Sequence, residues 1–216
     1  MTQRLRSPRN LTPPNGRPTK RQAEERYEEL LDRALDMFLE RGFELTTMEA
    51  VAASIRMTKR TVYSRYEDKR ALFRAAVRRA IDRWIAPIDA LEAAVTEDLE
   101  ASLLAIARIR VAITLTPAGL RLQRIINAES FRFPEILQNY EEAVTPAINF
   151  MAELFRRHEG GELGKLEDPE FAARAFLTIA GSPSRLVVLG KPADKVAIDE
   201  FTQKFVRLFL NGLRRG

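Results

Sequence analysis

The stretch TTMEAVAASIRMTKRTVYSRYEDKRALF, residues 46–73, decides the fold that we predict for this chain. Its apolar residues recur at helical spacing in two short runs, residues 48–55 and 62–66, with little room for a loop between them. Thr46 followed three residues later by Glu49 has the pattern of a capping box, which would start the first of two short helices. Helices this short are marginally stable alone, so they must pack against other elements.

The second short helix is predicted to turn basic and hydroxyl side chains outward. Thr58 can cap its start, and Val62 and Tyr66, one turn apart, supply its inward face. Its outward residues are Lys59, Arg60, Thr61, Tyr63, Ser64 and Arg65. A helix–turn–helix whose second helix is basic is typical of proteins that read the major groove of DNA.

The segment resembles the DNA-binding domain of the TetR family of bacterial transcriptional regulators. The residues that fall on the family's pattern are Thr47, Val51, Ala52, Thr58, Thr61, Val62, Tyr63, Tyr66, Asp68, Lys69, Leu72 and Phe73. So many positions at fixed spacing make the match far more specific than a single short motif. Arg56, Arg60 and Arg65 depart from the pattern, and Arg56 stands where the turn usually has a glycine. We expect the DNA preference of this chain to differ from that of its relatives at these arginines.

A second, looser resemblance covers the C-terminal part of the chain. Residues 127–136, NAESFRFPEI, and the units at residues 161–163 and 168–169 look like the AefR-like subgroup of TetR regulators. Together the two resemblances span most of residues 20–213. They imply a three-helix DNA-binding domain joined to a helical domain that binds a small-molecule effector. They also imply a homodimer that forms through the last two helices.

The periodicity of the remaining chain is helical throughout, without the alternation that is typical of strands. We therefore predict an all-α protein of about nine helices. A platform helix over residues 19–41 precedes the helix–turn–helix, with Thr19 and Gln22 at its start and Gly42 after its end. Later helices are predicted at residues 68–86, 99–116, 117–128 and 134–158, from Asp168 onward, and at 193–213, and residues 87–96 are expected to be a bend or a short helical stretch.

Positive charge gathers at the N-terminal end of the chain. The 216 residues carry a net charge of +5, yet residues 1–23 hold six basic residues and no acid, so the rest of the chain sums to −1. Such asymmetry is typical of an arm that binds a polyanion. The Gly-Arg-Pro unit around Arg17 resembles part of an AT-hook, which inserts an arginine into the minor groove, and a solvated basic tail explains it equally well.

Three parts of the chain follow from these observations. Residues 1–18 are predicted to be a disordered basic arm, residues 19–67 the helix–turn–helix domain, and residues 68–216 the effector-binding and dimerisation domain. Double-stranded DNA is the predicted partner. Base contacts are expected from Lys59, Arg60 and Thr61, because Lys or Arg to guanine is the commonest specific contact. Phosphate contacts are expected from Thr47, Thr58, Tyr63, Ser64 and Lys69, of which Tyr63 and Lys69 follow from the family resemblance.

A pocket for an effector of unknown identity is predicted among large side chains of the C-terminal domain. The candidates are Trp84, Ile106, Arg110, Phe131, Phe133, Phe150 and Phe176. Each apolar candidate can equally belong to a close-packed core. Arg110 shares its helical phase with Leu103 and Ile106. It therefore either reaches out to solvent, pairs with a buried carboxylate or binds an anionic effector.

Catalytic, cofactor and metal sites are not predicted. The chain has no cysteine, and its one histidine, His158, stands among charged residues and is expected to be solvated. No stretch has the pattern of a signal peptide or a membrane span, so we expect a cytoplasmic protein without a membrane partner. The alternative function is a helical interaction protein whose basic end binds a macromolecule other than DNA. Such a protein would show no salt-dependent affinity for duplex DNA.

Overall fold

The computed structural model describes residues 19–85, 87–182 and 194–214, and the regular structure in these ranges is helical. The helices are α1 (Lys20–Leu45), α2 (Met48–Ser54), α3 (Lys59–Tyr63), α4 (Lys69–Trp84), α5 (Ile88–Glu92), α6 (Leu99–Thr114), α7 (Pro117–Glu129), α8 (Pro134–His158), α9 (Pro169–Ala180) and α11 (Lys195–Leu213). The predicted all-α class is confirmed, and α5 falls in the stretch predicted as a bend or short helix. The predicted arm with Arg17 lies outside the described residues.

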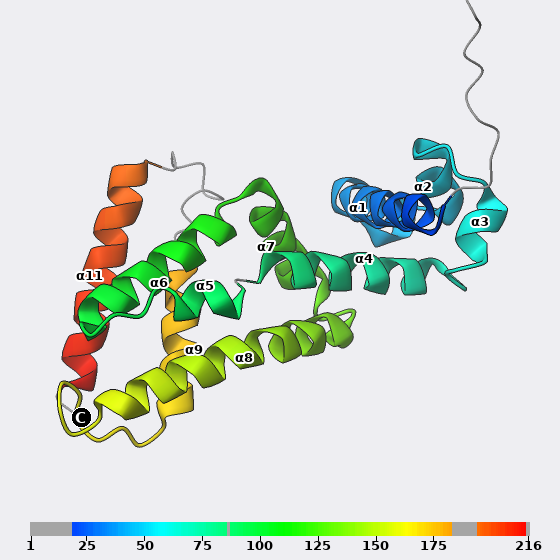
Figure 1. Ribbon diagram of the computed structural model, residues 1–216. Coiled ribbons are helices and arrows are strands. Elements are labelled where there is room, and N and C mark those ends of the chain that lie inside the picture. The colour runs from blue at the N-terminus through cyan, green and yellow to red at the C-terminus, as the bar shows by residue number, and fades with distance from the viewer. Residues whose placement is uncertain (1–18, 86, 183–193, 215–216) are drawn as a thin grey trace, which may run out of the picture.

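The molecule is elongated, with a small group of helices at one end and a larger group at the other (Figure 1). We call α1, α2 and α3 the head, and α5 to α11 the body. α4 runs from the head toward the body, and α8 follows a parallel course beneath it in this view. The C-terminal end of α11 lies far from the head. This arrangement makes α4 the covalent link between the two groups.

The first helix provides the platform that the two short helices need. At its predicted start the Thr19 hydroxyl oxygen accepts from the Gln22 N–H, and the Gln22 side chain accepts from the Thr19 N–H, so a capping box is present. Near its end Gly42 has φ of 81° and ψ of 166°, which interrupts the helical geometry where a stop was predicted. The chain then completes α1 at Leu45.

The start of α2 differs from the prediction. Thr47, not Thr46, is the cap, and its Oγ1 accepts from the Ala50 N–H at 3.1 Å. The Thr46 side chain is fully buried, and its Oγ1 lies 3.1 Å from the Met37 carbonyl oxygen and 2.9 Å from that of Gly42. The predicted capping box of Thr46 is therefore wrong. Two adjacent threonines have the same capping propensity, and packing against α1 decides which of them is buried.

Four phenylalanines tie the head to α4 and to the start of α8. The rings of Phe38, Phe43, Phe73 and Phe133 form a chain of aromatic contacts with centroids 4.8–5.7 Å apart. The same buried cluster extends to Leu122 and Ile125 on α7. The head therefore shares one hydrophobic core with α4 and with parts of α7 and α8. A movement of α4, α7 or α8 would therefore change the packing of the head.

A second core fills the body between α6, α8, α9 and α11. It includes the rings of Phe155, Phe176, Phe205 and Phe209, with centroids 5.2–6.4 Å apart. Residues of α6 such as Leu103 and Ile106 are fully buried in it. No single helix in the described ranges has the length and hydropathy of a membrane span. α6 and α7 reach that threshold only as a pair, and they are bent by 81° relative to each other.

Candidate nucleic-acid interface and ligand cavity

The outward face of α3 is exposed to solvent at the end of the molecule. Val62 is fully buried, and Tyr66, just after the helix, is 9% exposed, so α3 packs on the face that the sequence predicts. The opposite face presents Lys59, Arg60, Tyr63 and Ser64 to solvent. Tyr63 is 41% exposed, in agreement with its outward phase. Lys59, Arg60, Tyr63 and Ser64 are thus exposed on the outward face of α3.

The turn between α2 and α3 has a left-handed residue at Arg56, with φ of 56°. Glycine would occupy this region at lower cost, as the family pattern indicates. The Met57 N–H donates to the Ala52 carbonyl at 2.9 Å and closes the end of α2. From α1, Arg26 Nη2 donates to the Ile55 carbonyl at 3.1 Å and holds the turn in place. Sequence reasoning missed Arg26, because this contact joins residues that are 29 positions apart.

Glu49 on α2 holds two of the predicted DNA-binding residues. Its Oε1 lies 2.7 Å from Lys59 Nζ and accepts a hydrogen bond from Tyr63 Oη at 3.0 Å. The hydrogen bond from Lys59, a backbone hydrogen bond and the bond from Tyr63 lower the pKa of Glu49 to about 2. The carboxylate is therefore ionised at neutral pH. It keeps the Lys59 ammonium near the Tyr63 ring, 5.4 Å from its centroid.

Arg60 differs from Lys59 because its guanidinium is not held by another side chain. In the described part of the chain the Arg60 side chain makes no ion pair and no hydrogen bond, and the residue is exposed. Its planar group with five N–H donors is available for a bidentate contact. Of the predicted base-reading residues, Arg60 is therefore the one whose donors are all free.

Hydroxyl groups cap α2 and α3. Thr47 Oγ1 accepts from Ala50, as described above, and Thr58 Oγ1 accepts from the Thr61 N–H at 3.1 Å. The Thr58 and Thr61 hydroxyl oxygens lie 2.7 Å apart, and Ser64 Oγ donates to the Thr61 carbonyl at 2.8 Å. A capping threonine that accepts an amide proton keeps its own hydroxyl hydrogen for another acceptor. Thr47 is left with such a hydrogen, whereas the Ser64 hydrogen is already used.

The Lys69 and Arg65 side chains both contact groups of α1. Lys69 Nζ donates to the Phe43 carbonyl at 2.8 Å and to the Glu44 carbonyl at 3.1 Å, which leaves one of its three N–H donors for a further acceptor. Arg65 lies over the ring of Tyr27 on α1, 4.1 Å from its centroid. Both side chains thus have a structural role in addition to any contact with DNA.

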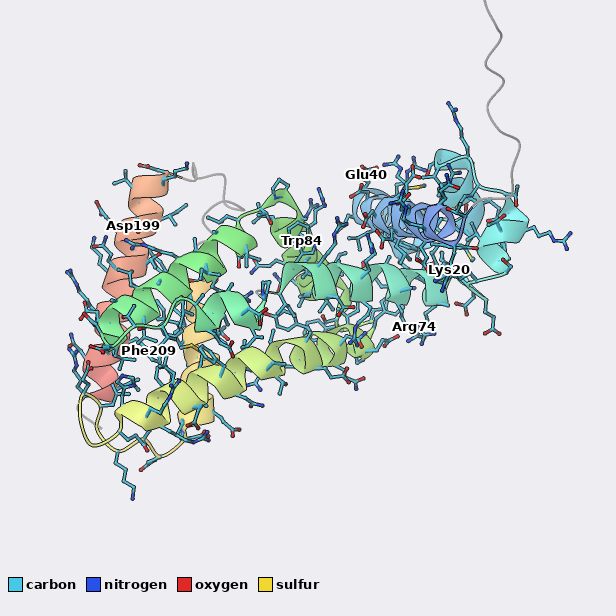
Figure 2. The ribbon with its side chains drawn as sticks, in the orientation of Figure 1. Lys20, Glu40, Arg74, Trp84, Asp199 and Phe209 are labelled. Carbon is cyan, nitrogen blue, oxygen red and sulfur yellow. The ribbon has the colours of Figure 1, made fainter. Side chains whose placement is uncertain are left out.

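Two adjoining cavities lie where α4, α6, α7, α8 and α9 meet, with volumes of about 410 Å³ and about 60 Å³. The residues that line both are Ile85, Arg110, Tyr140, Glu141 and Thr178. Trp84, a predicted pocket residue, lines the larger cavity. Figure 2 shows Trp84 at the body end of α4. The cavity therefore touches the helix that leads to the head.

Arg110 on α6 reaches between α8 and α9. Its Nη2 donates to Tyr140 Oη at 2.9 Å, and its Nε lies 3.5 Å from the Leu177 carbonyl oxygen. The side chain is half-buried, and no carboxylate among the described residues forms an ion pair with it. The predicted option of a buried carboxylate partner is therefore wrong, because the partner on α8 is a neutral phenol.

The other predicted pocket residues line neither cavity. Phe133 belongs to the aromatic cluster of the head, and Ile106 and Phe176 are fully buried in the body core. Phe150 packs against that core, and Phe131 is 98% exposed between α7 and α8. These residues were predicted because they are large and hydrophobic. Residues in the wall of a cavity and residues inside a close-packed core share both properties.

The prediction from sequence did not include the polar residues of the cavity wall. Gln123 and Asn127 on α7, with Tyr140 and Thr178, line the larger cavity. A polar side chain on the inward side of an amphipathic helix would be the signal for such a residue. That side can be identified only when the neighbouring helices are known, and here the wall is assembled from five of them.

Comparisons with protein families agree with both resemblances. A family model described as bacterial regulatory proteins of the tetR family matches residues 30–76. A second model, described as the C-terminal domain of AefR-like transcriptional repressors, matches residues 101–212. A comparison with curated proteins finds no match.

Solved structures of similar fold cover most of this chain and nearly all of their own. A TetR-family protein from Mesorhizobium loti has 23% identity and a TM-score of 0.70, and the match covers 90% of this chain and 98% of that one. The flavonoid-responsive regulator FrrA has 26% identity and a TM-score of 0.66, with 88% and 97% covered. Salmonella enterica GusR has 22% identity and a TM-score of 0.63, with 89% and 96% covered.

These matches and the exposed basic helix of the head point to the same protein class. The AefR-like model alone spans more than half of the chain, and the tetR model covers the helix–turn–helix. The chain belongs to the TetR family of bacterial regulatory proteins and is a DNA-binding transcriptional regulator.

Proposed function

We propose that this regulator is a ligand-responsive repressor that binds a palindromic operator as a homodimer, with α3 of each subunit in the major groove. The observation that carries the proposal is the exposed face of α3. It presents a free guanidinium at Arg60 beside the Lys59 and Tyr63 side chains that Glu49 holds. A helix of this kind, packed on a platform helix, has the geometry that major-groove readers share.

The side chains of this surface divide into two roles. Arg60 reads a base, with Lys59 and Thr61 as further base contacts, because a guanidinium with all donors free suits the O6 and N7 acceptors of guanine. Phosphate contacts are assigned to Thr47, Thr58, Tyr63, Ser64 and Lys69. In this role the Tyr63 and Ser64 hydroxyls turn away from Glu49 and from the Thr61 carbonyl, to which they donate in the free protein. Thr47 and Lys69 support this role with a hydroxyl hydrogen and an N–H donor that the fold leaves unused. Arg17 in the arm adds a minor-groove or phosphate contact.

The test compares variants on a duplex recovered by binding-site selection from a random library. We expect Arg60→Ala to lower discrimination between the selected duplex and a single-base variant by about 1–3 kcal/mol. Tyr63→Phe should weaken binding to all duplexes about equally, because it removes a hydroxyl that would turn from Glu49 to donate to a phosphate. Fluorescence anisotropy at two salt concentrations measures both effects. Unchanged discrimination in Arg60→Ala would exclude its base-reading role, and affinity without salt dependence would exclude DNA as the partner.

The homodimer is supported by apolar side chains that α9 and α11 expose. Phe171 is 69% and Ile179 42% exposed on α9, and Val196 is 65% and Leu208 75% exposed on α11. Large apolar side chains on two packed helices are typical of an interface between subunits. The proposed occupant is a second copy of the chain, related by a two-fold axis. Two α3 helices would then face the two halves of a palindrome.

The response to a ligand is supported by the position of the larger cavity. Its volume of about 410 Å³ falls within the range of small-molecule sites, and Trp84 at its wall ends α4. α4 begins next to α3 and shares a core with the head. A ligand that fits only one position of α4 would therefore shift the population between two arrangements of the heads. FrrA, a structural relative, is named as flavonoid-responsive, which agrees with an aromatic ligand for a cavity of this kind.

A further inference from the structure

We infer that the effector is an amphipathic organic anion whose acidic group pairs with Arg110. The inference rests on the proposed sensing function and specifies the chemical class of its ligand. It starts from the charge of Arg110, which forms no ion pair with a carboxylate in the described ranges.

Among the described residues, the Arg110 guanidinium has only neutral partners. Every Asp and Glu of the chain lies within the described ranges, and none of them forms an ion pair with Arg110. Its contacts are the Tyr140 hydroxyl at 2.9 Å and the Leu177 carbonyl at 3.5 Å. On the same helix, Arg108 is exposed and pairs with Asp199 at 2.8 Å. A half-buried guanidinium costs solvation free energy that an anion would offset, so the site is completed by a negatively charged group.

The other charges at the cavity wall do not change this conclusion. Glu141 lines both cavities, and its carboxylate already pairs with Arg174 of α9. These two charges offset each other, which leaves the charge of Arg110 uncompensated. The charge of Arg110 would repel a cationic ligand. A neutral ligand would leave the guanidinium without a counter-ion.

The remaining wall suits an apolar ring system. Trp84, Ile85, Leu122 and Ile126 line the larger cavity, and the amides of Gln123 and Asn127 also line it. Such a wall would bind a molecule with an aromatic or alicyclic body and one or two polar substituents. The acidic group would lie at Arg110 and the body against the end of α4. The ligand class is thus a ring-bearing carboxylate, sulfonate or phenolate, and not a sugar or an inorganic anion.

Two fluorescent probes test the charge directly. Anilinonaphthalene sulfonate and N-phenylnaphthylamine share a ring skeleton, and only the first carries an anionic group. Trp84 is the single tryptophan of the chain and lines the cavity, so quenching of its fluorescence reports occupancy. We expect Arg110→Met to lower the affinity for the sulfonate roughly tenfold or more and to leave that for the amine within about twofold. Arg110→Lys should recover part of the loss, and added salt should weaken only the sulfonate in the unsubstituted protein.

Controls separate the anion from the cavity. Arg108→Met makes the same charge change on the same helix and should alter neither affinity, because Arg108 pairs with Asp199 away from the cavity. Thr178→Phe adds volume at a residue that lines both cavities and should weaken both probes. If both probes bind in the cavity and Arg110→Met changes them equally, the anionic class is wrong and the sensing site stands. If neither probe binds, or both bind unchanged in Thr178→Phe, the sensing site itself is refuted.

Discussion

At the scale of single residues, Glu49 determines how the DNA-binding surface is presented. Its carboxylate holds Lys59 and Tyr63 at the same time, and it brings a negative charge to a surface that must meet phosphates. Its pKa of about 2 lies below the ordinary value of 4.5. The pairing therefore contributes fully above the ordinary pKa and is lost only as pH falls toward 2. Between about pH 6 and 8 this network should not titrate.

We predict that Glu49→Gln raises the affinity for any duplex. The substitution removes a negative charge and releases the Lys59 ammonium, so the slope of log affinity against log salt should steepen by roughly one. Anisotropy titrations with selected and random duplexes over a range of salt measure both quantities. Glu200→Gln is the matched control, since Glu200 lies on α11 and pairs there with Lys204. An unchanged slope in Glu49→Gln would show that the Glu49 carboxylate does not offset the positive charge that α3 brings to the DNA.

Some features of single residues depend on their neighbours in the chain, and others depend on how the helices pack. Arg56 could be predicted to enter a left-handed conformation, because the turn between two short helices requires it at that position. The burial of Thr46 and the inward bonds of Lys69 could not be predicted. They depend on where α1 ends in space, not on the residues next to them in the chain.

At the scale of elements, α4 is held on two sides by a row of arginines. Arg79 pairs with Glu28 at 3.0 Å and with Asp32 at 3.2 Å, both on α1. Arg78 pairs with Glu142 of α8 at 3.3 Å and with Asp82 on its own helix. α4 therefore contacts the head through one face and the body through the next. Figure 2 shows Arg74 of the same helix on the side away from α1.

We predict that Arg79→Met destabilises the protein more than Arg78→Met does. The Arg79 side chain is 19% exposed and that of Arg78 is 46% exposed, so solvent screens the Arg78 pairs more strongly. Loss of Arg79 should cost about 1–2 kcal/mol, and loss of Arg78 about 0.5 kcal/mol or less. Urea unfolding at one protein concentration gives both values. Equal costs would show that the partly buried pairs with α1 do not hold the head to α4.

Element boundaries were predictable where a residue acts on its own neighbours. Asp68 and Asp168 cap α4 and α9, and Pro117, Pro134 and Pro169 stand at the first positions of their helices. Each of these signals is local, and the predicted starts agree with the structure. The predicted pocket did not have such a signal. A cavity wall is a property of helices packed together, so the apolar candidates divided between two cores, a cavity and the surface.

At the scale of the whole molecule, the unpaired apolar face of α9 and α11 is what a second subunit would cover. We predict that Leu208→Glu converts a dimer to a monomer, because it places a charge at an apolar side chain that is 75% exposed. Loss of the dimer should also lower the affinity for the operator, since one subunit contacts only one half-site. Sedimentation velocity measures the mass. Leu137→Glu, at a residue 46% exposed on α8, is the control and should leave the dimer intact. A dimeric Leu208→Glu protein would refute this interface.

The sequence by itself determined the all-α class, the helix–turn–helix and the outward face of α3. Helical periodicity, caps and first-turn prolines act over a few residues, and the motif from Thr47 to Phe73 has many residues at fixed spacing. Only the tertiary structure decided that Glu49 holds Lys59 and Tyr63, and that Arg110 meets a phenol instead of a carboxylate. These contacts join separate helices. Their distances depend on how the helices pack, which periodicity along the chain does not specify.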